Sequence, residues 1–344
     1  MCVKENKQLN NKKVYLGGFF MFQFNPNLIF ISVDSGKSGN KFSWLNAKHQ
    51  IESDVFSTLA KKIANPTFAG DSDLLELNDN IYLIGGTGEY ALDNDHSKLS
   101  KTHELCVLNS IAKVLNEKLE LPQQEDIYQV VLSINVPLED FKTSTKNEYI
   151  DLYHDKVFTL KLNSKPVSFK VVGLELFFEG QGAIIRNHQL TGKQVLVYDI
   201  GGKNDTMLLF GVNGKPVAGK NDMNYDGLLV MLQHIADDLR RKYNTRFNIQ
   251  EVEQMVLGIN KVEGFDTLFE QHATEWVKKF KSQVMKLGIN TQLTTILFTG
   301  GGSIALNKQL TNEFSEYKDV QFSNDGKYDN ATGGLIKALN LYAN

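Results

Sequence analysis

Two apolar stretches of this chain each run into an aspartate, a glycine-containing turn and a second apolar stretch. The first is LIFISVDSGKSGNKFSW (28–44), and the second is VLVYDIGGKNDTMLLF (195–210). Runs that are rich in β-branched and aromatic residues and are bounded by glycine predict buried strands. The sequence therefore predicts two β-hairpins with an acid at each turn. Their separation by about half the chain favours two halves of like topology that face one another.

The rest of the sequence alternates between strand and helix patterns. A nearly continuous apolar stretch at 127–137 predicts a strand covered on both faces, which is typical of α/β proteins. A hairpin is predicted at 157–172, and a strand followed by a glycine turn at 294–302. Apolar residues at helical spacing predict helices, one of which ends at Gly288 as a glycine cap would end it. These helices span 101–120, 225–243, 266–288 and 330–343.

Composition excludes several classes of protein. The formal net charge of −3 argues against extensive contact with bare nucleic acid, and the basic cluster at 239–246 is interpreted as cations at a helix end. Two scattered cysteines, Cys2 and Cys106, make no disulfide framework and predict a cytoplasmic protein. No stretch reaches the roughly 18–20 apolar residues of a membrane span. The early apolar patch is not followed by a signal-peptide cleavage site.

The letters Gly-Lys-Ser at 36–38 do not form a P-loop. That motif needs a glycine five positions before its Gly-Lys, and Ile31 stands there. Glycine turns of another kind also bind phosphate, because their successive backbone N–H groups point at its oxygens. Asp34 and Asp199 beside a polyphosphate would need a cation, for which hydrated Mg²⁺ is suited, and Lys41 would add a point charge. The alternative for each aspartate alone is an ordinary turn residue.

These motifs resemble those of the actin, heat-shock chaperone and sugar kinase ATPase superfamily, and most of all the plasmid-segregation actins of the ParM type. In that family the first phosphate loop has the spacing of Asp34, Gly36 and Lys41, and the second has the pattern at 199–202. The adenosine turn is similar to 300–302. The last helix of that family opens in the same way as Asn330, Ala331 and Gly333 do here. The resemblance covers roughly residues 24–343.

A further resemblance concerns Glu179, which is followed by Gly180 and Gly182. It is similar to the glutamate with which ParM-like proteins position the attacking water. Hydrolysis of a γ-phosphate needs such positioning together with charge neutralisation. The alternative is a solvated carboxylate at the start of a helix. One departure from the family is that Lys203 and Asn204 stand where threonine is common.

The resemblance implies a nucleotide site built from three turns. The implied catalytic residues are Glu179, Asp34 and Asp199, and the last two would hold Mg²⁺ through water. The implied nucleotide-binding residues are Ser35, Gly36, Lys37, Ser38, Gly39, Asn40, Lys41, Gly201, Gly202, Lys203, Asn204, Gly300, Gly301, Gly302 and Asn330.

The implied fold is α/β, with two RNase H-like domains of the actin-like ATPase kind around a central nucleotide cleft, each carrying an inserted subdomain. The expected divisions are 22–194 plus 327–344 for domain I with an insertion at about 46–100, 195–326 for domain II with an insertion at about 219–290, and 1–21 as an N-terminal extension.

The resemblance implies an ATPase that binds ATP, or GTP, with Mg²⁺ and polymerises with copies of itself into dynamic filaments. It implies a role in plasmid DNA segregation through a DNA-bound adaptor protein, with no direct DNA contact and no membrane. Two alternatives stay open. One is a small-molecule kinase of the same fold, which would present an aspartate base to a sugar hydroxyl. The other is a MreB-like or pilus-assembly scaffold with little hydrolysis, for which the patch at 14–24 is a weak candidate anchor.

Overall fold

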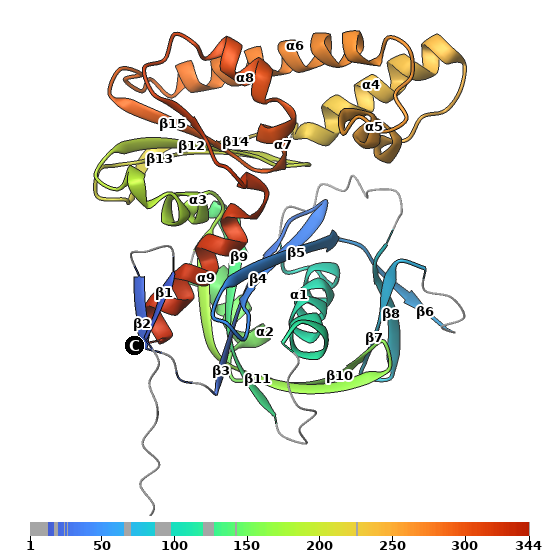
Figure 1. The fold of residues 1–344 in the computed structure, drawn as a ribbon, viewed down its shortest axis with the longest axis vertical. Coiled ribbons are helices and arrows are strands. Elements are labelled where there is room, and N and C mark those ends of the chain that lie inside the picture. The colour runs from blue at the N-terminus through green and yellow to red at the C-terminus, as the bar shows by residue number, and fades with distance from the viewer. Residues whose placement is uncertain are drawn as a thin grey trace, which may run out of the picture.

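The computed structural model describes residues 13–16, 20–23, 25, 27–64, 70–86, 98–119, 127–141, 143–224 and 226–343. Within these ranges two large sheets are stacked along the long axis of the molecule (Figure 1). None of the helices in the described ranges is long and apolar enough to cross a bilayer.

The lower sheet contains nine strands and carries the first acid-tipped hairpin. Strands β3, β9 and β11 run parallel, and the other pairs are antiparallel. In spatial order the strands are β5 (Ile51–Ser57), β4 (Gly39–Leu45), β3 (Leu28–Ser35), β9 (Tyr128–Val136), β11 (Lys165–Phe178), β10 (Val157–Leu162), β7 (Ser72–Leu77), β8 (Asn80–Gly85) and β6 (Ala60–Ile63). Only residues 58 and 59 join β5 to β6, although these strands lie at opposite ends of the order. The sheet therefore curls back on itself (Figure 1).

Helix α1 (Lys101–Lys113), continued by a π-helical turn (Val114–Lys118), lies inside this curve (Figure 1). Buried residues follow one another from 105 to 112, including Leu105, Leu108 and Ile111. A helix whose residues are buried on nearly all sides has to be covered all round, and the curled sheet provides that cover. This core also holds Cys106.

Helix α9 (Asp329–Tyr342) packs on the opposite face of the lower sheet. Leu335 and Leu339 lie against Phe30 of β3 and Val131 of β9 in one apolar cluster. Helix α2 (Thr143–Tyr153) packs beside β11. Strands β3 and β9 are therefore covered on both faces, which accounts for the nearly continuous apolar sequence of β9.

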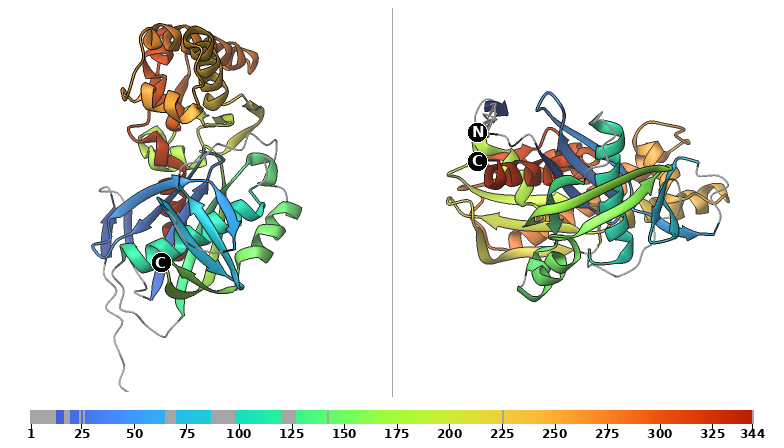
Figure 2. Two further views of the ribbon diagram at one scale, coloured as in Figure 1. Left: turned by 90° about the vertical axis from the view of Figure 1, so that its right-hand side faces the viewer. Right: turned by 90° about the horizontal axis from the view of Figure 1, so that it is seen from below.

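The upper sheet carries the second hairpin. Its strands, in spatial order, are β14 (Pro216–Asn224), β13 (Asp205–Phe210), β12 (Gln194–Ile200), β15 (Thr294–Thr299) and β16 (Val320–Phe322). One face is covered by α4 (Leu228–Tyr243), α5 (Ile249–Val256), α6 (Phe265–Lys286) and α8 (Asn307–Glu313). The short helices α3 (Gln181–Arg186) and α7 (Gly301–Ala305) lie close to the junction with the lower sheet (Figure 1). The left view of Figure 2 shows the same two-part arrangement from the side.

The strands and helices that the sequence predicts are present, with ends that differ by a few residues. Gly288 has a positive φ of 58° and donates its N–H to Met285 at the end of α6, so the predicted glycine cap is confirmed. Near the N-terminus, β1 (Lys13–Leu16) pairs with β2 (Phe20–Gln23). The other residues of 1–21, and the side chains of the patch at 14–24, lie outside the described residues. The domain boundaries stay a prediction.

Candidate functional site

Strands β3 and β4 form the first acid-tipped hairpin. Asp34 is the penultimate residue of β3, and the residue in register with it on β4 is Lys41. The Lys41 ammonium nitrogen Nζ lies 3.6 Å from Asp34 Oδ2. In the turn between them, a Cβ on Gly36 would lie 2.9 Å from the carbonyl oxygen of Gly39. The tight turn therefore requires glycine at this position.

Strands β12 and β13 form the second hairpin in the same way. Asp199 is again the penultimate residue of its strand, and it accepts a 2.7 Å hydrogen bond from Nδ2 of Asn330. The turn that follows is attached to α4, whose first N–H groups, those of Leu228 and Leu229, donate to carbonyl oxygens at 201 and 202. The glycine turn is thus fixed on the end of a long helix.

Both hairpins line one cleft, whose volume is about 500 Å³. That volume is typical of sites for small ligands. Parts of α4 and α5, together with Lys327, complete the wall. The predicted site residues that line this cleft are Asp34, Ser38, Gly39, Lys41, Asp199, Gly201, Gly202, Gly300, Gly301, Gly302 and Asn330.

The remaining predicted nucleotide-binding residues lie elsewhere on the two turns. Asn40 is fully buried and donates a 2.7 Å hydrogen bond to Ser110 of α1, because alternation along β4 turns it away from the side on which Lys41 lies. Ser35 is buried within the hairpin, and residues 37 and 203 are partly exposed on the turns. Asn204 donates to Glu179. Any nucleotide contact by Asn40 would therefore have to come from its backbone.

Glu179 follows β11 and is only 9% exposed. Its Oε2 accepts hydrogen bonds of 3.3 Å from Asn204 Nδ2 and from Thr206 Oγ1, both on the second hairpin. Its Oε1 lies 3.2 Å from Nζ of Lys98. Burial and these partners contradict the alternative of a freely solvated carboxylate.

Lys98 is a site residue that the sequence analysis missed. Its side chain is 4% exposed, and Nζ lies 3.1 Å from Asp34 Oδ1 and 2.7 Å from Asn135 Oδ1 at the end of β9. With Glu179 as the third partner, one ammonium joins two of the three predicted catalytic residues. Lys98 stands in a polar stretch just before α1, so neither hydrophobic periodicity nor a motif marks it.

The two hairpin aspartates differ in their electrostatic surroundings. Burial would raise the pKa of Asp34, but Lys98 and Lys41 outweigh it and hold that pKa below its usual value. Burial also raises the pKa of Asp199, and repulsion from Asp34 and Glu179 adds to the rise. Asn330 and Lys41 offset only part of this, so the pKa of Asp199 reaches about 7. The positive charge near Asp199 is therefore too small to balance the carboxylates around it.

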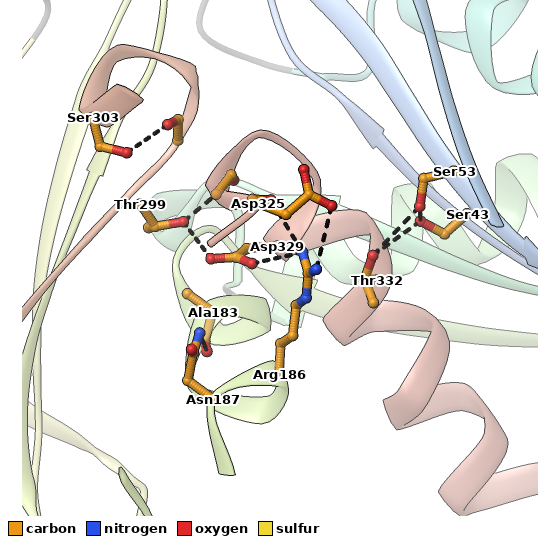
Figure 3. A network of polar contacts seen from close by, with 12 residues as sticks. Ser43, Ser53, Ala183, Arg186, Asn187, Thr299, Ser303, Asp325, Asp329 and Thr332 are labelled. Carbon is orange, nitrogen blue, oxygen red and sulfur yellow. Dashed lines mark hydrogen bonds and ion pairs between the residues drawn. The ribbon is translucent and has the colours of Figure 1, made fainter. Parts of the chain in front are cut away.

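A network of ion pairs and hydrogen bonds supports the start of α9 (Figure 3). Asn330 is the second residue of this helix. Arg186 of α3 donates to Asp329 Oδ1 at 3.0 Å and also contacts Asp325. Thr299, at the end of β15, donates to Asp329 Oδ2 at 2.6 Å. Asn330 then joins Asp199 to the residue that follows Glu179, because its Oδ1 accepts from the N–H of Gly180 at 3.1 Å while its Nδ2 donates to Asp199.

The glycines after Glu179 and at the start of α9 have a packing role. A Cβ on Gly333 would clash with the backbone of Gly182, and one on Gly182 would clash with the backbone at 329 and 330. Helices α3 and α9 therefore touch through their backbones. This close approach places Asn330 beside Gly180.

The residues present fit a magnesium-bound nucleotide. The approach of phosphates is favoured by the N–H groups of the glycine turns and by the Lys41 ammonium. The space beside Gly301 is also open, because a Cβ added there would meet nothing within 4 Å. In the described ranges no three His, Cys, Asp or Glu side chains converge to bind a metal directly. Mg²⁺ often keeps most of its waters and takes one or two carboxylates, so Asp34 and Asp199 are compatible with it.

No family model matches this sequence, and no curated protein matches it. Solved structures match over almost the whole chain. The apo pSK41 ParM protein aligns with a TM-score of 0.69 and 17% identity, covering 92% of this chain and 98% of its own. The archaeal actin homolog Ta0583 aligns with a TM-score of 0.74 and 13% identity, covering 91% and 99%, and has also been solved in complex with ADP.

A third similar structure is that of the Alp12 filament. It aligns with a TM-score of 0.68 and 19% identity, covering 92% of this chain and 99% of its own. Coverage of this kind, together with two sheets that each carry an acid-tipped hairpin, confirms the fold expected from the motifs. The chain therefore has the actin-like α/β fold of the ParM-type structures.

Proposed function

We propose that this protein is an actin-like ATPase that binds ATP with Mg²⁺, assembles with copies of itself into filaments and hydrolyses ATP to turn these filaments over. The observation that carries the proposal is that Asp34 and Asp199 line one glycine-rich cleft, with Glu179 near enough to Asp199 to repel it. Burial and repulsion from Asp34 and Glu179 disfavour the charged form of Asp199, so the arrangement favours a site that receives a cation. The fold is that of proteins solved with ADP or as filaments.

Each part of the site has a chemical task in this proposal. The turns at 36–39 and 201–204 bind phosphate oxygens through backbone N–H groups, and Lys41 adds a positive charge. Asp34 and Asp199 hold the hydrated metal, which when bound neutralises charge on the phosphates. Glu179 orients a water molecule toward the γ-phosphorus and accepts its proton. The products are ADP and inorganic phosphate.

The wider role is plasmid DNA segregation in the cytoplasm, through an adaptor protein that binds DNA and the filament. Support comes from the similar structures, which are named as ParM proteins and filaments. The acidic net charge of −3 favours contact with an adaptor over direct contact with DNA. The division into domain I at 22–194 plus 327–344 and domain II at 195–326 belongs to the same proposal.

Light scattering and phosphate release, followed together over a range of protein concentrations, test this function. With ATP and Mg²⁺ we expect scattering to rise above a critical concentration and phosphate release to follow it. With EDTA, both signals should stay at baseline. Phosphate release that needs an added sugar, or scattering without any release, would instead support the kinase or the scaffold. Flat signals in every condition would contradict the proposal.

A further inference from the structure

Lys98 has an environment that is unusual for a lysine. Its side chain is 4% exposed, and its ammonium has three oxygen partners, on Asp34, Asn135 and Glu179, at 2.7–3.2 Å. An ammonium has three N–H donors, so this set uses all of them. Lysine is almost never buried unless it is paired, and the two carboxylates of this set provide the pairing.

We propose that Lys98 is a positioning residue of the hydrolytic site, whose ammonium holds the Glu179 carboxylate in the orientation that aligns the attacking water. This inference rests on the proposed ATPase function and deepens it. The chemistry that Lys98 serves is the attack of water on a terminal phosphate. Lys98 acts through Glu179 and does not need to touch the nucleotide.

The hydrogen bonds of Glu179 show how this works. Oε2 accepts from Asn204 and Thr206, both at 3.3 Å, which are long and neutral contacts. Oε1 faces Lys98 at 3.2 Å, and this is the one charged partner among them. Charge-assisted hydrogen bonds are roughly twice as strong as neutral ones, so Lys98 fixes the plane of the carboxylate more firmly than the two neutral donors do.

The same ammonium keeps two carboxylates close together. Oδ1 of Asp34 and Oε1 of Glu179 both lie within 3.2 Å of Nζ. Without the positive charge these buried groups would repel one another, and a buried carboxylate left without its cation costs several kcal/mol. Glu179 would then leave the position in which its other oxygen faces the second hairpin. Lys98 therefore links the first hairpin to the residue that serves hydrolysis.

The fold holds Lys98 itself in place. Two residues later, Ser100 caps α1 by accepting the N–H of His103. Helix α1 is enclosed by the curled lower sheet, so the residues at its start are attached to a rigid element. A side chain on such an element is positioned more accurately than one on a free loop.

The test compares wild type with Lys98→Met, Glu179→Gln and the double variant. Lys98→Met should slow single-turnover phosphate release by about 100-fold or more, while the affinity for a fluorescent ATP analogue changes by less than about 10-fold. Because Lys98 acts through Glu179, the double variant should be no slower than Glu179→Gln alone. The double variant loses one positive and one negative charge, so its net charge equals that of wild type. It can therefore still be measured if Lys98→Met alone fails to fold.

Lys113→Met is the matched control, since Lys113 lies at the other end of α1 and forms a 3.0 Å ion pair with Asp73 away from the cleft. It should lower the unfolding temperature and leave phosphate release unchanged. Release by Lys98→Met within threefold of wild type would overturn the inference. A double variant in which the two reductions in the rate of phosphate release multiply would also overturn the inference. A wild-type protein that releases no phosphate would instead contradict the proposed function, and the inference with it.

Discussion

The hairpin β3–β4 and the hairpin β12–β13 place their aspartates alike but surround them differently. Each aspartate is the penultimate residue of the first strand of an antiparallel pair. Asp34 has two lysine partners, with nitrogen–oxygen distances of 3.1 Å to Lys98 and 3.6 Å to Lys41. Asp199 has a neutral amide donor in Asn330, at 2.7 Å.

This difference shows that two hairpins with the same backbone arrangement can surround their aspartates with different charges. The pKa of Asp34 is held below its usual value by its lysines, against the effect of burial. The pKa of Asp199 is raised to about 7 by burial and by the neighbouring carboxylates. The negative charge of Asp34 is neutralised by lysines of the chain itself. The negative charge of Asp199 is the one that a bound cation would stabilise.

Glu179 contacts residues of both halves, so its removal should have the largest effect. Glu179→Ala should slow phosphate release by about 100- to 1,000-fold, because the water loses the group that orients it and accepts its proton. Nucleotide binding should persist, and filaments should last longer than those of wild type. Phosphate release and light scattering measure this. Unchanged release would refute the role of Glu179.

Identical substitutions in the two hairpins should change stability in opposite directions, and the first should be the larger change. Asp34→Asn removes one buried partner of Lys98 and the partner of Lys41, so the free energy of unfolding should fall by about 3 kcal/mol. Urea denaturation without nucleotide measures it. A loss below about 1 kcal/mol would mean that the first hairpin is not stabilised by its lysines.

Asp199→Asn should instead raise the free energy of unfolding by roughly 1–2 kcal/mol at pH 8 without metal, because a charge is removed that burial and two carboxylates disfavour. The same variant should lose most of the dependence of nucleotide affinity on Mg²⁺. Denaturation and nucleotide titrations with and without EDTA measure the two effects. A lower free energy of unfolding for Asp199→Asn than for wild type would show that the Asp199 carboxylate is not destabilised by its neighbours.

The raised pKa of Asp199 determines how the stability gained by Asp199→Asn depends on pH. At about pH 4 and below, the Asp199 carboxyl is protonated in both the folded and the unfolded chain, so wild type and Asp199→Asn should differ little. Between about pH 4 and 7 the unfolded chain gives up its proton first, and the wild type loses stability relative to the variant. Above pH 7 the difference should be constant. A difference that grows toward acid pH would contradict the direction of the shift.

Lys41→Met should have the smallest effect on stability, below about 1 kcal/mol, because its 3.6 Å contact with Asp34 is long and the side chain is 21% exposed. Nucleotide affinity should nevertheless fall by about 10-fold, since a phosphate-binding cation is lost. Titration with a fluorescent ATP analogue measures this. Unaltered affinity would place the phosphates away from the first hairpin.

The sequence predicts the elements of the fold well and the contacts of the site only in part. Glycine turns, β-branched runs and helical spacing are local signals, so the hairpins and the longer helices could be found from them. The partner of a side chain depends instead on where distant elements meet. Lys98 reaches Asp34 and Glu179 because the curled sheet encloses α1, and no local pattern encodes that curl.

Asn40 illustrates the same limit. The family resemblance implies nucleotide binding for all the turn residues from 35 to 41, but strand alternation sends Asn40 into the core toward Ser110 while Lys41 faces Asp34. Glu179 could be named only through the family resemblance. Its contacts with Asn204 and Thr206 arise from the packing of the two halves, which sequence spacing does not give.

The most direct test of the account is a crystal structure of the protein with Mg²⁺ and a non-hydrolysable ATP analogue. We predict that the phosphates lie between the turns at 36–39 and 201–204, that the metal with its waters lies between Asp34 and Asp199, and that Glu179 faces the terminal phosphate. A nucleotide bound outside this cleft, or hairpin carboxylates too far apart to share one hydrated metal, would contradict the account.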